Sequence, residues 1–467
     1  MLMDRCDMKS SAKNAFTGNG ILKTVLALAI PTVIGQIILV IYNIADTFFV
    51  SLTGSDAKIS AVTVCLPAFM FLSAISNLFG IGASSAMARA LGKGKLRRAK
   101  RASSFAFWGC LVLTLLYSLS VLGFLHPYVR LLGGIDEEAH LYASSYMLVT
   151  VVAGGVFASM SALLSHLFRA EGRSLVSSIG VSLGGFFNIA LDPLFMFVIL
   201  PEGKEVLGAG IATALSNLCA FVFFLIALKR RGKKKTVLRL SVSVKRLKKT
   251  FEKKIPADIL RAGLPACLMT LFENVSYAVL GSLCAHHSLE AHAGIGVAKK
   301  INMLAHCIVR GMAQGVLPFI SFNYAAGKWK RMRRGIFTAL AVSVSLAALC
   351  MGACLLFPDA LVRLFIREQT ASRMYGTSFL RILCIGAPFS ACAYMLISFF
   401  QATGKGVHSF MLAVLRKGAL DIPLMFLLGA AGGIFRVVWA TPLADIFCCL
   451  VAVILLVLFL KKKEVHA

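Results

Sequence analysis

The chain contains 467 residues, of which 58% are hydrophobic and only 15% charged, and its mean hydropathy is +0.82. This composition excludes a water-soluble globular protein and indicates an integral membrane protein. The net charge of +29 would suggest nucleic-acid binding in a soluble protein. Solvated basic loops beside membrane helices account for it here, so no nucleic-acid partner is expected.

Twelve apolar segments follow one another along the chain, each long enough to cross a bilayer core, which takes roughly 20 helical residues. They lie near 25–50, 60–90, 102–126, 140–168, 175–200, 207–228, 257–284, 292–322, 335–357, 375–402, 408–430 and 436–460. Backbone amides in lipid must be satisfied within the segment, and the residue alternation of a membrane barrel is absent. The sequence therefore predicts an all-α integral membrane protein with twelve transmembrane helices.

Lysine and arginine are concentrated in alternate loops, whereas the intervening loops are poor in basic residues and hold acidic ones, namely Asp136, Glu137, Glu138, Glu202, Glu205 and Glu290. The basic stretches are 93–101, 229–254, 328–334 and 461–463. By the positive-inside rule, these loops and both termini are expected to face the cytoplasm. We therefore expect a multi-pass protein of the plasma membrane whose surroundings are the lipid bilayer.

Four sequence patterns of the first half recur in the second half at an offset of between about 229 and 235 residues. Six spans per half give both copies the same orientation, so the halves are predicted to be parallel repeats related by an axis along the membrane normal. The matched patterns are Ala29-Ile-Pro31 with Gly263-Leu-Pro265, Gly92-Lys93 with Gly327-Lys328, Phe168–Arg173 with Phe400–Lys405, and Asp192–Phe197 with Asp421–Phe426. The predicted division is a tail at 1–20, a six-helix lobe at 21–228, a basic linker at 229–256, a second six-helix lobe at 257–460 and a tail at 461–467.

Ionisable residues inside a membrane span are costly, so they are candidates for functional sites. In the first span Asp46 follows Gln36, Tyr42 and Asn43, and the spacing of three places Asn43 and Asp46 on one helical face. Gln36, Tyr42 and Asn43 are expected to line a substrate cavity. Asp46, near the end of its span, could instead be an interfacial anchor.

The fifth and sixth spans carry a second group of polar residues. Asn188 and Asp192 are four residues apart and share a helical face, and Pro193 follows directly. A proline at this position is expected to kink the helix or to free a backbone carbonyl, and both favour a polar ligand at mid-depth. Thr213, in the small-residue run that opens the sixth span, offers a hydroxyl.

The second half has charged residues in its seventh and eleventh spans. Glu273 lies in the seventh span, where it could serve transport or act as a structural partner of a neighbouring helix. The eleventh span contains Arg416, Lys417 and Asp421. These three residues could form a charged site, but Asp421 could also be an interfacial anchor, and the two basic side chains could extend to lipid headgroups.

Three glycine pairs have the spacing typical of closely packed membrane helices. They are Gly180 with Gly184, Gly311 with Gly315, and Gly429 with Gly433. Close helix packing is predicted at all three.

Several of these segments resemble the signatures of the multidrug and toxic compound extrusion (MATE) family. The resemblance covers nearly the whole chain. It is carried by 31–50 in the first span, by 168–172 and 188–193 around the fourth and fifth spans, by 311–324 in the eighth, and by Arg416 seven residues before Pro423. Asp421 departs from the family pattern, in which this position is usually apolar.

The resemblance implies a V-shaped pair of six-helix lobes around a central cavity. It implies secondary active export of amphipathic, cationic small molecules in exchange for H⁺ or Na⁺ by alternating access. The first-helix aspartate, the fifth-helix pair and the sixth-helix threonine form the cation-coupling cluster in many members, and the matching residues are Asp46, Asn188, Asp192 and Thr213. Another branch couples through acids of the second lobe, for which Glu273 is the nearest candidate, with Arg416 and Asp421 beside it.

The resemblance implies no cofactor and no metal beyond a possible Na⁺, and we expect a monomer. Oxygen ligands from aspartate, asparagine and threonine suit Na⁺, whereas a carboxylate in an apolar lobe suits H⁺, so both coupling ions stay open. One alternative is a lipid-linked oligosaccharide flippase of the same superfamily, for which Lys299, Lys300, Arg310 and Arg436 could line a cavity. A membrane-embedded enzyme is the other alternative, but the spans show neither a nucleophile with its base nor a metal cluster. The chain is therefore not expected to be an enzyme.

Overall fold

The computed structural model describes residues 15–18, 20–133, 136–240, 250–251, 254–368 and 370–464. These residues are largely helical and contain no strand. The predicted N-terminal tail lies mostly outside the described residues, as do 241–249 and 252–253 of the predicted linker and 465–467 of the predicted C-terminal tail.

The first half of the chain forms helices α2 to α9, two of which continue into π-helical segments (η). The bounds are α2 (Ile21–Ser51), α3 (Asp56–Gly92), α4 (Leu96–Gly123), α5 (Leu125–Leu131), α6 (Glu137–Met147), η1 (Leu148–Ala153), α7 (Gly155–Ala170), α8 (Ser174–Leu194), η2 (Phe195–Ile199) and α9 (Glu205–Lys235). The π-helical segment η2 begins two residues after Pro193, where the sequence predicts a break in regular helix.

The second half of the chain forms helices α11 to α19 and repeats this plan. The bounds are α11 (Ile255–His287), α12 (Leu289–Ala325), α13 (Trp329–Leu356), α14 (Pro358–Arg363), α15 (Ala371–Ile385), α16 (Ala387–Thr403), α17 (Gly406–Val414), η3 (Leu415–Asp421), α18 (Ile422–Ala430) and α19 (Ile434–Glu464). The segment η3 contains all three charged residues of the predicted eleventh span.

Nine helices of the described ranges are long and apolar enough to cross a membrane. Two further pairs of helices, each bent at a short break, are long and apolar enough when each pair is taken as one span. The bends are 47° between the α6–η1 segment and α7, and 46° between α15 and α16. The remaining predicted span, α17–η3–α18, is helical throughout but carries three charges. At 1.5 Å per residue, α2 extends roughly 46 Å, which exceeds the roughly 30 Å hydrocarbon core and allows tilt. The predicted fold class, an all-α membrane protein with twelve spans, is confirmed.

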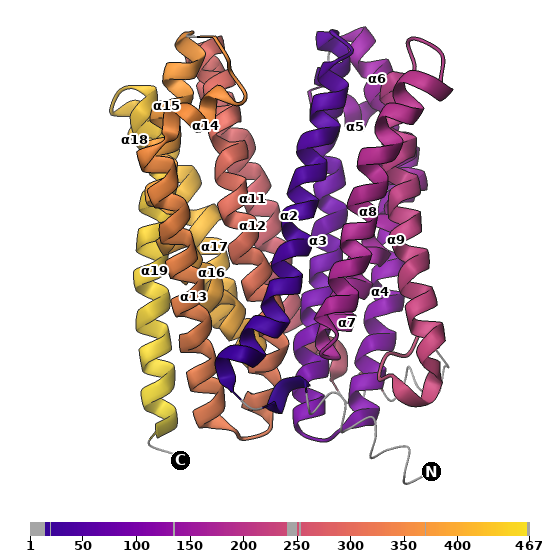
Figure 1. The fold of residues 1–467 in the computed structure, drawn as a ribbon, viewed down its shortest axis with the longest axis vertical. Coiled ribbons are helices and arrows are strands. Elements are labelled where there is room, and N and C mark those ends of the chain that lie inside the picture. Colours follow the sequence, from indigo (N-terminus) through magenta and orange to yellow (C-terminus); the bar gives the residue numbers. More distant parts are fainter. Residues whose placement is uncertain are drawn as a thin grey trace.

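The two halves form two helix bundles that stand side by side, with α2–α9 in one and α11–α19 in the other (Figure 1). The start of α2 and the end of α19 lie at the same end of the molecule, which we call the terminal end. Equivalent turns in the two halves share one backbone geometry. Gly94 and Gly327 have positive φ angles of 68° and 73°, and Gly172 and Gly404 have 82° and 75°. The counterpart of Gly327 is therefore Gly94, two residues after the Gly92 with which the sequence pattern pairs it. These left-handed turns, which favour glycine, follow the internal repeat.

The seam between the bundles is formed by α2 against α12 and by α3 against α11. Glycines allow the backbones to approach closely there. A Cβ added to Gly263 would lie 1.8 Å from the carbonyl oxygen of Leu78, and one added to Gly315 would lie 2.8 Å from that of Leu28. Side chains at these positions would force the helices apart.

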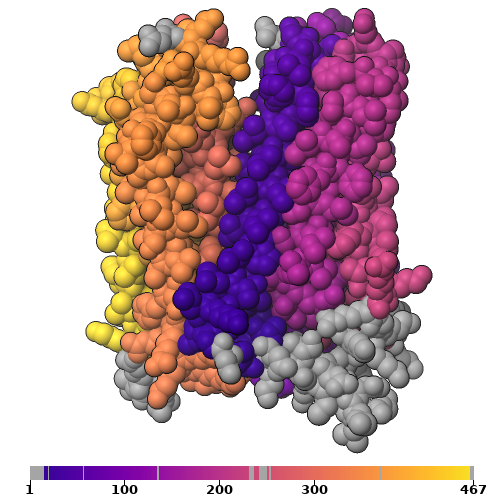
Figure 2. Space-filling view, viewed as in Figure 1, coloured from indigo at the N-terminus to yellow at the C-terminus, as the bar shows by residue number. Residues whose placement is uncertain are grey.

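Hydrogen bonds between the halves gather toward the terminal end of the seam. They include those from Ser85 Oγ to Gln401 O at 2.6 Å, from Arg169 Nη1 to Gln314 Oε1 at 2.7 Å, and from Arg98 to Asp258. Another, from Asn77 Nδ2 to Thr270 Oγ1 at 2.9 Å, lies further from that end. At the opposite end the space-filling view shows the two halves parted from each other (Figure 2). The molecule is therefore closed at the terminal end and open at the other.

A short helical turn at 15–17 precedes α2 and crosses this seam. The Phe16 side chain is fully buried and packs against the ring of Phe322, with centroids 5.2 Å apart. Arg331 of α13 donates to the carbonyl oxygens of Phe16 at 3.3 Å and Gly18 at 2.7 Å. On the other side, a Cβ at Gly172 would lie 2.6 Å from that of Ala15. The turn thus contacts both halves at the terminal end.

Two of the three predicted glycine pairs lie at close helix contacts. A Cβ at Gly180 would lie 2.3 Å from the Phe224 ring of α9, and one at Gly311 would lie 2.6 Å from the Cα atom of Val33 in α2. In the third pair the prediction holds for Gly429, whose added Cβ would lie 3.3 Å from Val437 of α19, and is wrong for Gly433. Gly433 has a φ of +82° in the turn between α18 and α19, with no atom within 4 Å of its added Cβ.

Candidate functional site

Three of the four residues predicted as a coupling cluster are joined by hydrogen bonds in the first half. The Nδ2 atom of Asn188 donates to Asp192 Oδ1 at 3.1 Å and to Thr213 Oγ1 at 3.3 Å. All three side chains are buried, and Asp192 is 0% exposed. The spacing of four on α8 therefore places Asn188 and Asp192 on one face, as predicted, and α9 brings Thr213 to that face.

Asp46 reaches the same cluster from α2. This helix packs along α8, where a Cβ at Gly185 would lie 3.4 Å from the Tyr42 ring. Asp46 is close enough to Asp192 for the two charges to interact, and Tyr42 lies within electrostatic reach of both acids. We call Asp46, Asn188, Asp192 and Thr213 the acidic cluster.

The acidic cluster contains more hydrogen-bond acceptors than donors. Asp46 Oδ1, Asn188 Oδ1 and Asp192 Oδ2 are all buried and accept no hydrogen bond from a protein group. Buried polar atoms are normally paired, because an unpaired acceptor loses its hydration without compensation. Two carboxylate oxygens and an amide oxygen are hard ligands for a cation, and each carboxylate could equally hold a proton.

The other first-half candidates surround this cluster less directly. Asn43 donates from Nδ2 to the carbonyl oxygen of Leu39 at 2.6 Å, so its amide group already makes a hydrogen bond within α2. Gln36, earlier on α2, is half-buried. That Gln36, Tyr42 and Asn43 line a substrate cavity stays a prediction. Sequence reasoning missed Tyr146 of α6, which is buried within electrostatic reach of Asp46 and Asp192.

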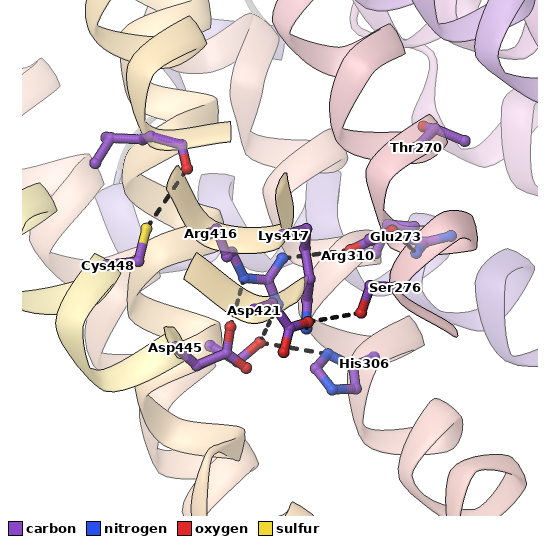
Figure 3. Close-up of polar contacts among 12 residues, drawn as sticks. Thr270, Glu273, Ser276, His306, Arg310, Arg416, Lys417, Asp421, Asp445 and Cys448 are labelled. Carbon is purple, nitrogen blue, oxygen red and sulfur yellow. Dashed lines mark hydrogen bonds and ion pairs between the residues drawn. The ribbon is translucent and has the colours of Figure 1, made fainter. Parts of the chain in front are cut away.

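In the second half, Arg416 is the centre of a buried polar network (Figure 3). This side chain is 0% exposed. It donates from Nε to Asp445 Oδ1 at 2.7 Å, from Nη1 to Glu273 Oε1 at 3.3 Å and from Nη2 to Ser390 Oγ at 2.5 Å. The network therefore joins α11, α16, η3 and α19.

Glu273 has two arginine partners. Besides Arg416, Arg310 of α12 donates to Glu273 Oε2 at 2.9 Å, and the Glu273 and Arg310 side chains are 23% and 34% exposed. These ion pairs make Glu273 a partner of two neighbouring helices, and a role in transport stays a prediction. Because both carboxylate oxygens are engaged by guanidinium groups, Glu273 differs from the unpaired acids of the first half.

Asp421 is also fully paired. It accepts from Lys417 Nζ at 2.9 Å and Ser276 Oγ at 2.6 Å through Oδ2, and from Thr441 Oγ1 at 2.9 Å through Oδ1. The alternative that Arg416, Lys417 and Asp421 are interfacial groups is wrong, because all three are buried inside the second bundle. Their charges compensate one another there.

Sequence reasoning missed Asp445 of α19 and His306 of α12. Asp445 is the only acidic residue between 436 and 460, so the rule that flagged the other intramembrane acids would have found it. His306 lies with its Nδ1 3.4 Å from Ser390 Oγ.

A model of the MatE protein family matches residues 31–194 and 265–427. The chain belongs to the MatE family. The model matches once in each half, in agreement with the internal repeat. Members of this family are transporters, which confirms that the chain is a membrane transporter and not an enzyme.

Relatives of this MatE protein are similar over almost their whole length. The multidrug export protein MepA of Staphylococcus aureus (strain NCTC 8325 / PS 47) is 29% identical, with 98% of each chain covered. A solved structure of MATE in complex with MaL6 has a TM-score of 0.87 at 23% identity and covers 97% of this chain and 99% of its own. A multidrug resistance MATE family transporter of the MOP superfamily, in an outward-facing conformation, has a TM-score of 0.86 at 23% identity. The match covers 97% of this chain and 98% of that transporter.

Three of the four cations considered for a flippase have separate partners in this MatE protein. Arg310 pairs with Glu273. Lys299 is buried and donates to the carbonyl oxygen of Tyr277 at 2.7 Å, with its Nζ 3.7 Å from the ring centroid of the same residue. Arg436 is bonded to the carbonyl oxygen of Ala431 near the surface. Together with the family match, this arrangement favours the exporter over the flippase.

Proposed function

We propose that this MatE transporter exports amphipathic, cationic small molecules in exchange for H⁺ or Na⁺, and that the acidic cluster is its coupling site. The relatives named as multidrug export proteins support the direction of transport and the substrate class. The observation that carries the coupling site is the set of three buried acceptor oxygens on Asp46, Asn188 and Asp192 that receive no hydrogen bond.

The acidic cluster can act as a switch because its two carboxylates repel each other. In a low dielectric, two nearby acids do not both stay ionised without a compensating cation. Binding of a proton or Na⁺ relieves that repulsion and draws α2 toward α8. The same α2 packs against α12 at the seam through Gly311 and Gly315. A change at the cluster is therefore transmitted to the contact between the halves.

In this proposal the terminal end faces the cytoplasm, because the basic loops lie there. The closed seam then separates the cytoplasm from a cavity that is open to the outside. The buried charges around Arg416 form a rigid counterpart to the switch, since Glu273, Asp421 and Asp445 each already have a basic partner. Transport is expected to alternate and to saturate, as two bundles rock about the seam.

The test is efflux of a fluorescent amphipathic cation from proteoliposomes, under an imposed pH gradient and, separately, under an imposed sodium gradient. The parent protein should respond to one of the two gradients. Asp46→Asn and Asp192→Asn should each reduce gradient-driven efflux at least tenfold, because each removes a charge that the coupling ion must compensate. The matched control is Glu290→Gln, which removes an exposed acid at the start of α12 and should leave efflux unchanged.

Gradient-driven efflux at the parent rate in both aspartate variants would refute the coupling site. Efflux that ignores both gradients in the parent protein would refute the exchange mechanism itself. Equal insertion and equal elution as a folded protein are checked for every variant before rates are compared.

A further inference from the structure

A cavity of about 550 Å³ opens at the terminal end, between the start of α2 and the first turns of α13. Among the residues that the structure describes, its lining contains three basic side chains and no acidic one. The lining residues are Ile21, Lys330, Arg333, Arg334, Phe337 and Thr338. The cavity lies well away from the acidic cluster and from the network around Arg416, and neither the family nor the proposed transport cycle assigns it a role.

The cavity is shared by the two halves of the protein. Ile21 comes from the first helix of the first half, and the other lining residues come from α13 of the second half. Arg331, within the same turn of α13, bonds to the carbonyl oxygens of Phe16 and Gly18 just before α2. Figure 2 shows the start of α2 lying against the second bundle at this end. A molecule bound in the cavity would therefore contact both halves.

The side chains of the cavity change from charged to apolar along α13. Lys330, Arg333 and Arg334 are exposed in the first two turns, and Phe337 follows one turn later with 45% of its surface exposed. On α2, Leu22 beside the cavity is 52% exposed. Basic residues directly beside exposed apolar residues are typical of the level at which lipid headgroups meet acyl chains.

We propose that this cavity binds an anionic phospholipid, and that the bound lipid fastens α2 to α13 at the terminal end. The headgroup phosphate pairs with Lys330, Arg333 and Arg334, since arginine and lysine donate charge-assisted hydrogen bonds to phosphate oxygens. The first acyl carbons contact Ile21 and Phe337. Because the site spans the seam, lipid binding stabilises the conformation that is closed at the terminal end.

The test measures lipid binding by native mass spectrometry on the purified full chain, with phosphatidylglycerol and with phosphatidylcholine as probes. The parent should retain phosphatidylglycerol at least fivefold more than phosphatidylcholine. The triple variant Lys330→Gln/Arg333→Gln/Arg334→Gln should lose that preference. The internal repeat supplies a matched control in Lys93→Gln/Lys95→Gln/Arg97→Gln, which removes three exposed cations from the equivalent loop of the first half and should keep the preference.

A second variant tests the cavity without changing charge. Thr338→Trp fills the space and leaves all three cations in place, so it should also abolish the preference. It serves as the deciding variant if the triple variant does not fold. A parallel arm adds inorganic phosphate, which should not displace phosphatidylglycerol if the acyl contacts contribute to binding.

Three results would overturn the proposal. One is an equal loss of phosphatidylglycerol in the triple variant and in the repeat-related control, which would mean a non-specific surface effect. Another is full retention of the preference in Thr338→Trp, which would place the lipid outside the cavity. The third is phosphatidylglycerol binding that appears only after residues 1–14 are deleted, which would assign the cavity to the start of the chain. Since none of these readouts measures transport, failure here is distinguishable from failure of the coupling proposal.

Discussion

Arg416 and Asp445 form a hydrogen-bonded ion pair of 2.7 Å whose side chains are 0% and 2% exposed. Removing one partner of such a pair leaves an uncompensated charge that cannot be rehydrated, which costs about 3–5 kcal/mol. We therefore expect Asp445→Leu to lower the thermal unfolding midpoint of the purified protein strongly, although Asp445 lies far from the acidic cluster.

The double variant Arg416→Met/Asp445→Leu provides the control. It removes both charges and leaves Glu273 paired with Arg310, so it should unfold at a higher temperature than Asp445→Leu alone. A double variant that is no more stable than the single one would show that the pair is not the source of the loss.

The two acids of the acidic cluster should behave as one site. If Asp46 and Asp192 share a single coupling ion, the variant Asp46→Asn/Asp192→Asn should be no slower in gradient-driven efflux than the slower single variant, within about twofold. Efflux rates measured in parallel proteoliposomes decide this. Losses that multiply would mean two independent sites.

Closure of the seam should depend on glycine where the backbones meet. Gly263→Ala places a methyl group against the carbonyl oxygen of Leu78, which the added Cβ would approach to 1.8 Å, so α3 and α11 must separate. A cysteine introduced at Ser85, which bonds across the seam, should then react at least threefold faster with a maleimide. Gly352→Ala on α13, where nothing lies within 4 Å, should leave the rate unchanged.

The orientation of the protein can be tested at the two ends of α9. Glu202 lies three residues before α9 and Arg230 lies near its C-terminal end, and both residues are exposed. In intact cells an impermeant thiol reagent should modify Glu202→Cys and spare Arg230→Cys, with the parent protein as the background for its native cysteines. Modification of Arg230→Cys from outside would reverse the assignment of the terminal end to the cytoplasm.

The fold was predictable from the sequence because lipid leaves a helical segment few alternatives. Each apolar run had to satisfy its own backbone, and the repeat fixed the relative orientation of the halves. The π-helical segments were harder to predict from the sequence. Pro193 signals a break in α8, but no proline lies within η3, where the buried Arg416, Lys417 and Asp421 instead have to reach partners on other helices.

The candidate sites were predictable where both residues lie on one helix. The spacing of Asn188 and Asp192 gives their shared face directly. Pairing between helices was not predictable, because it depends on how each helix is rotated in the bundle. For this reason Glu273 could be named, but its engagement by Arg310 and Arg416 could not, and Asp445 was missed in the most apolar span.

The turn at 15–17 reaches its packed position only after α12 has been synthesised. Phe16 is buried beside Asn323, which donates to its carbonyl oxygen and comes 307 residues later. During translation this phenylalanine must therefore wait until α12 has been made and inserted before it can leave solvent. A nascent chain that stops after α9 keeps Phe16 exposed, so quality-control factors that recognise exposed aromatic side chains could distinguish a half-made transporter from a finished one.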